Sequence, residues 1–232
     1  MVWGMPLPSS GGPYGPYGDF EGDQWLDRLR THFNETMTDE ERLPHKDGYG
    51  SPAHSFPFFV WGKFIYEIGT TDGPEGLPFT PIESHEPPTF FSAVNGQKSL
   101  ASIISLPSRM WGVDEQVKTI VERLEPGIHE FYPIEIRFPR GKVWPNPYYV
   151  LVFRQYFDSL VPEKCKDDAL KVTEYSKKAI SGRVFSKAKF GKAHLWRDRV
   201  FGEWMACISD ELHDELDKAG LLLPKQYRMI EV

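Results

Sequence analysis

Between residues 113 and 124, apolar side chains recur with the period of an α-helix. They occupy positions i, i+4, i+7, i+8 and i+11, which places them on one face; they are Val113, Val117, Ile120, Val121 and Leu124. Asp114 lies in the expected first turn, where the helix dipole favours an anion, and Pro126 and Gly127 follow the last apolar residue. The pattern therefore predicts an amphipathic helix that ends near residue 125.

The next two apolar runs have the patterns of β-strands. From residue 128 to 138, apolar and more polar positions alternate, and Ile134, Ile136 and Phe138 share the apolar face. Residues 148–153 are apolar at every position, which favours a central strand covered on both faces. Proline and glycine crowd the segment between the two runs, so we expect a hairpin connection there.

A shorter version of this plan closes the chain. Ile208, Leu212, Leu216 and Ala219 lie at i, i+4, i+8 and i+11, which predicts a second amphipathic helix. Its expected cap is Ser209 or Asp210, and Gly220 is its expected end. Side-chain oxygens of serine and aspartate cap helix N-termini, and glycine is favoured just past the C-terminus.

Four segments resemble a known family. They are LEPGIHEFYPIEIR, YYVLVFRQYFDSLVPEKC, HLWRDR and ACISDELHDELDKAGL. In their order and spacing they are similar to bacterial polymorphic-toxin immunity proteins, in particular immunity protein family eleven, first catalogued as a domain of unknown function. The similarity covers about residues 100–232. It implies a cognate protein toxin as the partner, and it supplies no catalytic residues.

The rest of the chain predicts an α+β protein with a mostly antiparallel sheet and a few packed amphipathic helices. Residues 1–22 have the glycine- and proline-rich composition of a disordered or extended, flexible N-terminal arm. We expect residues 23–232 to form a single α+β domain. Within it, residues 24–33 predict a short helix and residues 34–57 a loop, and the aromatic run 58–69 predicts a strand or a pair of strands.

The bulk composition limits the class of protein. There is no run of 18 apolar residues, which predicts no membrane span, and the first residues lack the pattern of a secretory signal. With two cysteines, Cys165 and Cys207, the chain has no disulfide framework and no zinc-type spacing. These features predict a cytoplasmic protein; the oligomeric state stays open.

Charge is unevenly distributed, and it leaves one alternative function open. The net charge is −6. Residues 1–112 hold 14 acids and 7 bases, whereas residues 161–200 hold 5 acids and 11 bases. Residues 176–199 interleave Phe185, Phe190 and Trp196 with lysines, a pattern that suits RNA or DNA binding through base stacking and phosphate contacts. The acidic total argues against nucleic acid as a partner.

Candidate catalytic chemistry is sparse. The sequence contains no phosphate-binding glycine loop, no nucleophile elbow and no metalloprotease motif. A small enzyme built on Cys165 and a histidine is the second alternative, because Lys164 and Lys166 could lower the thiol pKa. A plain exposed thiol explains the residue better, because no small-residue elbow surrounds Cys165. We therefore expect no enzymatic activity, no cofactor and no metal site.

The partner-binding prediction rests on charge and aromatic residues. Glu75, Glu83 and Glu86 lie in a proline-stiffened loop, which would lose little entropy on binding. Trp144, in the expected hairpin loop, is a candidate aromatic anchor. Many cytosolic nuclease toxins have basic clefts, so an acidic surface would speed their encounter. The alternative is that these acids form a solubilising surface.

Overall fold

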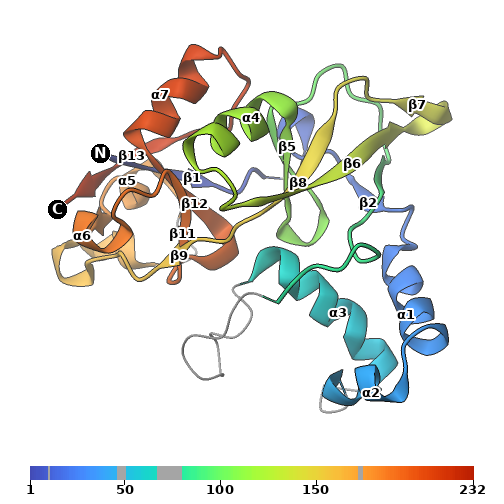
Figure 1. The fold of residues 1–232 in the computed structure, drawn as a ribbon. Coiled ribbons are helices and arrows are strands. Elements are labelled where there is room, and N and C mark those ends of the chain that lie inside the picture. Colours follow the sequence, from blue (N-terminus) through green and yellow to red (C-terminus); the bar gives the residue numbers. More distant parts are fainter. Residues whose placement is uncertain (10, 46–50, 67–79, 172–174) are drawn as a thin grey trace.

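The computed structural model describes residues 1–9, 11–45, 51–66, 80–171 and 175–232. Its strands form two mixed β-sheets (Figure 1). The six-stranded sheet has the order β10 (Val184–Phe185), β13 (Tyr227–Glu231), β1 (Val2–Pro6), β12 (Met205–Ser209), β11 (Leu195–Asp198), β9 (Tyr156–Phe157). The seven-stranded sheet has the order β2 (Gly18–Phe20), β3 (Phe90–Ala93), β6 (Glu130–Phe138), β8 (Tyr148–Val152), β5 (Trp111–Asp114), β4 (Ile103–Ser105), and β7 (Lys142–Val143) pairs with β6.

The predicted α+β class is confirmed, with one refinement. Most neighbouring strands are antiparallel, as expected, but β10–β13, β9–β11 and β3–β6 are parallel. The sheets are therefore mixed rather than purely antiparallel. β8 lies between β5 and β6, so the strand predicted to be central is central. Along β6, Ile134, Ile136 and Phe138 are buried and alternate with exposed positions, as the period of two predicted.

Both predicted amphipathic helices form, and they pack against each other on one side of the molecule (Figure 1). In α4 (Glu115–Leu124) the Asp114 side chain caps the Val117 N–H at 2.9 Å. In α7 (Asp210–Lys218) the Ser209 hydroxyl caps the Leu212 N–H at 3.1 Å. Their apolar faces join one buried cluster. Val113 and Ile208, which the period assigned to the helices, lie in the preceding strands instead.

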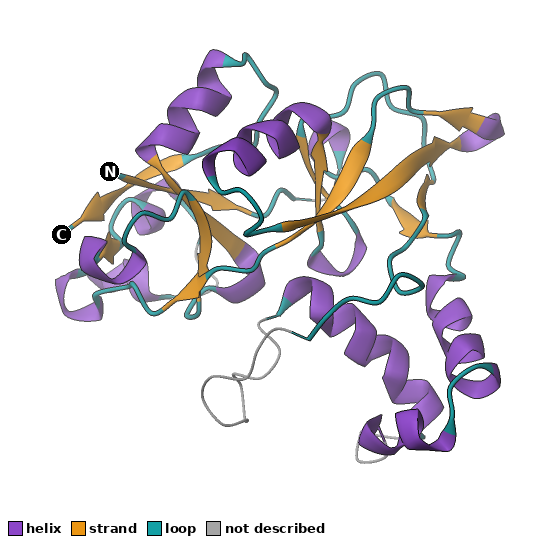
Figure 2. Ribbon diagram, in the orientation of Figure 1, coloured by secondary structure: helices purple, strands orange, loops and turns teal. Residues whose placement is uncertain are grey.

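A second helical layer covers the opposite face of the seven-stranded sheet (Figure 2). It consists of α1 (Trp25–Glu35), α2 (Asp39–Arg42) and α3 (Pro52–Ile65). The prediction of strands over 58–69 is wrong for residues 58–65, and residues 67–69 lie outside the described residues. Phe56, Val60 and Phe64 lie at i, i+4 and i+8 and pack on the sheet, so burial in a helix accounts for the aromatic run. The loop expected over 34–57 contains α2 and the start of α3.

The prediction of a disordered or extended arm over residues 1–22 is wrong for β1. This strand lies inside the six-stranded sheet, antiparallel to β12 and to β13, with Val2 fully buried and Met5 almost so. At Gly4, an added Cβ would lie 2.8 Å from the Ile180 side chain and 2.9 Å from that of Met229, so glycine permits close packing. Glycine and proline between residues 6 and 18 dominate the local composition and conceal the short apolar strand.

Two short helices, α5 (Lys177–Ile180) and α6 (Lys187–Phe190), accompany the six-stranded sheet. Together with β10 they contribute to a third buried cluster on that sheet, which includes Ile180, Phe185, Phe190 and Trp196. Among the described residues, no helix is long and apolar enough to cross a membrane.

Candidate partner-binding grooves

The structure separates the four predicted partner-binding residues. Glu75 lies outside the described residues. Glu83 is exposed, whereas Glu86 is 2% exposed and forms an ion pair with Lys63 of α3 at 2.6 Å. Glu86 also accepts the Glu83 N–H at 2.8 Å. The acidic loop is therefore not a uniform charged surface, because Glu86 holds the loop against α3 and cannot reach a partner in this conformation.

Trp144 is half-buried beside the end of β6. Its indole meets Phe138 edge to face at 6.0 Å, and its backbone N–H donates to the Ile136 carbonyl at 2.8 Å. It lines a groove of about 800 Å³ together with Ser84 and Pro87 of the acidic loop. Trp144 and the loop that carries Glu83 thus meet at one surface. Contact of either residue with a partner stays a prediction.

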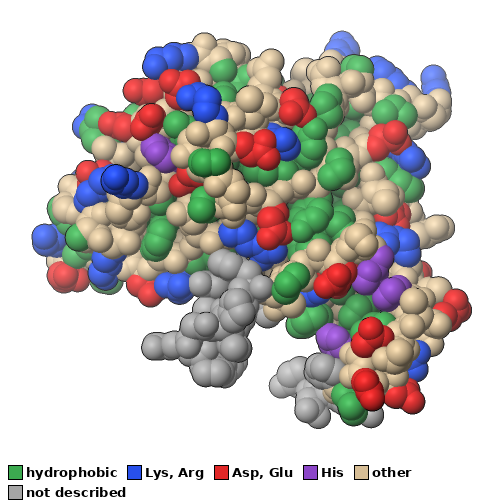
Figure 3. All heavy atoms as spheres, viewed as in Figure 1, with side chains coloured by type: hydrophobic (Ala, Val, Ile, Leu, Met, Phe, Trp, Pro, Cys, Tyr) green, Lys and Arg blue, Asp and Glu red, His purple; other side chains and the backbone are tan. Residues whose placement is uncertain are grey.

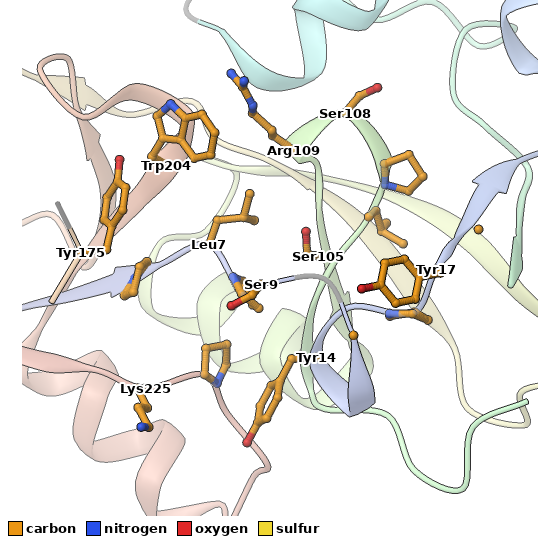
Figure 4. Close-up of a pocket in the computed structure, with 18 of the residues that line it drawn as sticks. Leu7, Ser9, Tyr14, Tyr17, Ser105, Ser108, Arg109, Tyr175, Trp204 and Lys225 are labelled. Atoms are coloured by element: carbon orange, nitrogen blue, oxygen red, sulfur yellow. The ribbon is translucent and has the colours of Figure 1, made fainter. Parts of the chain in front are cut away.

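A larger groove, of about 1230 Å³, opens where the N-terminal segment passes between the two sheets (Figure 4). It is lined by five aromatic residues, five prolines, two cations and several small or hydroxyl-bearing residues, and none of the described lining residues is acidic. The aromatic residues and cations are Tyr14, Tyr17, Tyr175, Trp204, Tyr227, Arg109 and Lys225. Sequence reasoning missed this site because its walls come from five separate segments. The PYGPYG repeat, which holds Tyr14 and Tyr17, was the only available signal.

Arg109 is held rigidly at the rim of this groove. Its guanidinium lies 4.0 Å from the centroid of the Trp204 ring, and one nitrogen forms an ion pair with the Glu203 carboxylate. Ser108 and Arg109 both adopt left-handed backbone conformations, with φ of 59° and 62°. The Trp61 indole fixes this turn by donating to the Ser108 carbonyl at 3.1 Å. Left-handed conformations are uncommon for residues other than glycine, so the surroundings must enforce the turn.

Tyr175 faces Trp204 across the wall of the groove, with ring centroids 6.3 Å apart. Burial raises the pKa of its phenol to about 12, so the hydroxyl keeps its proton at neutral pH. This hydroxyl has no hydrogen-bond partner among the described residues. A buried hydroxyl without a partner costs stability, so Tyr175 is a local cost in the wall of the groove.

A third pocket, of about 450 Å³, lies between α1, α3 and the acidic loop, where histidine side chains gather on the surface (Figure 3). The rings of His32 and His85 stack at 3.7 Å. Burial, followed by nearby cationic groups, lowers the pKa of His45 and of His85, so both favour the neutral form at pH 7. Among the described residues, no three histidine, cysteine, aspartate or glutamate side chains are placed to hold a metal ion.

The thiol hypothesis finds no support in the geometry. Cys165 accepts the Val184 N–H at 3.3 Å and donates to the Val161 carbonyl at 3.4 Å. Burial raises the pKa of Cys165, so the neighbouring lysines do not produce the activated thiolate that the sequence allowed. Cys207 is fully buried, and burial raises its pKa well above the usual value.

The nucleic-acid hypothesis loses the aromatic residues on which it depended. Phe185, Phe190 and Trp196 are each at most 3% exposed. Phe190 and Trp196 stack on each other at 4.6 Å inside the core of the six-stranded sheet. Bases could not stack on these rings without unfolding that core, so the lysines of residues 176–199 are not interleaved with an exposed aromatic platform.

Glu125, in the Leu-Glu-x-Gly motif of residues 124–127, joins the two sheets. The Glu125 carboxylate accepts hydrogen bonds from His129 Nε2 at 2.9 Å, from Gln155 at 2.7 Å, and from the N–H groups of His194 at 2.6 Å and Leu195 at 3.0 Å. Burial alone would raise the pKa of Glu125, but these hydrogen bonds outweigh it and lower the pKa. The motif therefore connects the end of α4 with β11 and has a structural role.

The two sheets, their helical layers and the open grooves define an α+β protein. A family model described as the immunity protein family Imm11 matches residues 25–227. Because this match spans most of the chain, the protein belongs to that family. The match extends well beyond the expected residues 100–232 and includes α1, α2 and α3, whereas β1 and β2 precede it. No curated protein matches the sequence.

Proposed function

We propose that this protein binds a cognate bacterial toxin domain and neutralises it by stoichiometric occlusion of the toxin's active site. The family match over residues 25–227 carries the proposal. Occlusion requires no catalytic chemistry from this chain, in keeping with the general behaviour of immunity proteins. The encounter would take place in the cytoplasm, where the two free thiols stay reduced.

The accessible surfaces are compatible with this role. A specific protein interface buries about 800 Å² on each partner, which is more than one groove supplies. We therefore propose that Glu83 and Trp144 contribute to the interface, since both lie at the surface of one proline-rich region. Glu86 is left out because its carboxylate is buried against Lys63.

Co-expression tests the proposal. The partner is the C-terminal domain encoded by the neighbouring upstream reading frame, produced alone and together with this protein. We expect co-expression to restore host growth and the two chains to co-purify in a 1:1 complex. A toxin domain from an unrelated locus is the control for specificity. Restored growth without a stable complex would contradict occlusion and indicate that the toxin or its product is modified instead.

A further inference from the structure

The largest groove differs in charge from the rest of the molecule. The chain as a whole has 33 acidic and 27 basic residues. Among the described residues, the 19 that line the groove include Arg109 and Lys225 and no aspartate or glutamate. Lys225 is exposed and has no ion pair among the described residues. An anionic group that enters the groove therefore meets the charge of Lys225 and the remaining donors of Arg109, whose charge is partly offset by Glu203.

The Arg109 side chain is already positioned to bind an anionic group. Its guanidinium carries five N–H donors, and the Glu203 carboxylate engages one nitrogen. The side chain is 42% exposed, so its remaining donors can reach a ligand. Stacking on Trp204 and the enforced left-handed turn hold the group in place before binding, which lowers the entropy lost when a partner carboxylate docks.

The walls of the groove suit an extended peptide. Prolines line it along the N-terminal segment and on the turn that carries Arg109, and tyrosines stand between them (Figure 4). Aromatic grooves of this kind accept extended chain, because the rings offer apolar faces to side chains and hydroxyl donors to backbone carbonyls. Tyr17 is 56% exposed at the rim, so its ring and hydroxyl are accessible to a bound chain.

We propose that this groove receives an extended, acidic segment of the toxin, with one carboxylate on Arg109 and a second near Lys225. The proposal rests on the proposed function and names the surface of the toxin that it involves. An acidic segment bound here would tie the partner to the N-terminal segment, to the turn before β5 and to Trp204 together, so both sheets would contribute to the interface.

Charge reversal in the groove tests the proposal with the toxin domain used for co-expression. We expect Lys225→Glu to raise the Kd roughly tenfold or more and to reduce its dependence on salt. The matched control is Arg140→Glu, which makes the same change of charge at an exposed residue of the β6–β7 hairpin that does not line the groove. We expect its Kd to stay within roughly twofold of the wild-type value, because only nonspecific long-range attraction changes.

Photo-crosslinking locates the contact independently. The photoreactive amino acid p-benzoylphenylalanine is introduced at Tyr17, and in a separate control at Ile128, which is exposed between α4 and β6 and lines neither groove. We expect crosslinks from position 17 to a toxin peptide rich in aspartate or glutamate, and none from position 128. Melting curves confirm that each labelled protein is folded.

These experiments distinguish failure of the proposed function from failure of the groove proposal. If the wild-type protein neither binds nor protects against the domain, the proposed function is wrong. If the wild-type complex forms but Lys225→Glu and Arg140→Glu bind equally well, only the groove proposal is overturned. Crosslinks from position 128 in place of position 17, or to a toxin segment without acidic residues, also overturn it.

Discussion

In the seven-stranded sheet, β5, α4 and β6 form a β-α-β unit whose two parallel strands flank the antiparallel β8. In the six-stranded sheet, β12, α7 and β13 form the same unit around the antiparallel β1. The outer neighbours also correspond. β3 and β10 run parallel to β6 and β13, and β4 and β11 run antiparallel to β5 and β12. The two halves therefore repeat one arrangement of five strands and a helix.

The halves differ in the origin of the central strand. β8 follows β6 through the short connection 139–147, so the seven-stranded sheet closes locally. β1 lies at the other end of the chain from β13, so the six-stranded sheet closes only when distant segments meet (Figure 1). Local closure costs little loop entropy, whereas closure by β1 depends on long-range packing. We therefore expect the six-stranded sheet to be more sensitive to changes near the N-terminus.

Removal of residues 1–9 should have the largest effect. It deletes the central strand, exposes backbone groups of β12 and β13, and removes the buried side chains of Val2 and Met5. Each such side chain contributes about 1.5–3 kcal/mol by burial alone, so we expect a loss of at least about 5 kcal/mol, comparable to the whole stability of many domains. Thermal and chemical unfolding measure the loss.

A permuted chain sharpens this comparison. Val2 pairs with Met229, so residues 1–9 can be joined after Val232 by a short linker and return as a hairpin. The order β13–β1 then matches β6–β8, and we expect most of the lost stability to return. An unchanged melting temperature in the deletion variant would show that β1 is dispensable and that the two halves do not differ in this way.

The second largest loss of stability is expected at Glu125, which joins the two halves. Glu125→Ala removes the carboxylate that accepts hydrogen bonds from His129 and from the backbone of His194 and Leu195. Because these buried donors lose their partner, we expect a loss of about 3–4 kcal/mol. Glu122→Ala, on the exposed side of α4, is the control, with an expected change below about 0.5 kcal/mol. Equal effects in urea unfolding would show that the junction is not held by Glu125.

The third largest loss of stability is expected when the ion pair between Lys63 and Glu86 is broken. Lys63→Met leaves the Glu86 carboxylate buried without its partner, and we expect a loss of about 3 kcal/mol. The double variant Lys63→Met/Glu86→Leu should recover part of it, since no unpaired charge remains. Glu83→Lys, in the same loop but exposed, should change stability by less than about 0.5 kcal/mol. A milder effect of Lys63→Met than of Glu83→Lys would contradict the buried pair.

Two buried carboxylates should make stability change with pH in opposite directions. They are Glu125 at the junction and Asp198 in the six-stranded sheet. The pKa of Glu125 is lowered from 4.5, so its contribution is present above that value and is lost as the pH falls through the folded-state pKa. Burial raises the pKa of Asp198 from 3.8, although hydrogen bonds from Ser159 and Leu160 partly oppose it. Its contribution is present below 3.8 and is lost as the pH rises through the folded-state pKa.

Unfolding free energies between about pH 3 and pH 7 test these signs. Relative to the wild type, Glu125→Gln should flatten the loss of stability toward acid, and Asp198→Asn should remove the decline in stability as the pH rises above 3.8. Curves of the two variants that differ from the wild type in the same direction would contradict the assignment.

The smallest effect is expected at Cys165. Its thiol makes two long hydrogen bonds near 3.3–3.4 Å at the edge of the six-stranded sheet. Cys165→Ser should cost less than about 1 kcal/mol and should leave protection against the toxin intact. Loss of protection by a folded Cys165→Ser protein would restore the hypothesis of a thiol enzyme.

The spacing of apolar residues predicted a helix or strand correctly where all the residues that define the pattern lie within that element. The helices over 115–124 and 210–218 and the strands over 130–138 and 148–152 were predicted from the spacing of their own apolar residues. The caps Asp114 and Ser209 were also predictable, because a cap bonds to a residue three positions along the chain. The likeness between the two helix–strand units was visible for the same reason.

Prediction failed where burial depends on distant residues. The aromatic run of α3 is buried on several sides, so it shows no clear alternation of apolar and polar positions that would distinguish a helix from a strand. The residues that flank Glu86 in the sequence are typical of an exposed loop. Its charge is neutralised by Lys63, which lies 23 positions away in the chain. Trp144 lies in the expected hairpin loop, yet the groove beside it requires the proline loop of residues 84–88.

By itself, then, the sequence determined the local elements, the α+β class and the resemblance to immunity proteins, because each depends on neighbouring residues and their spacing. Only the tertiary structure decided that residues 2–6 complete a sheet and that Glu125 joins the two halves. It also decided that Arg109, Trp204 and Lys225 face one groove. These three results depend on contacts between residues far apart in the chain, which no local pattern encodes.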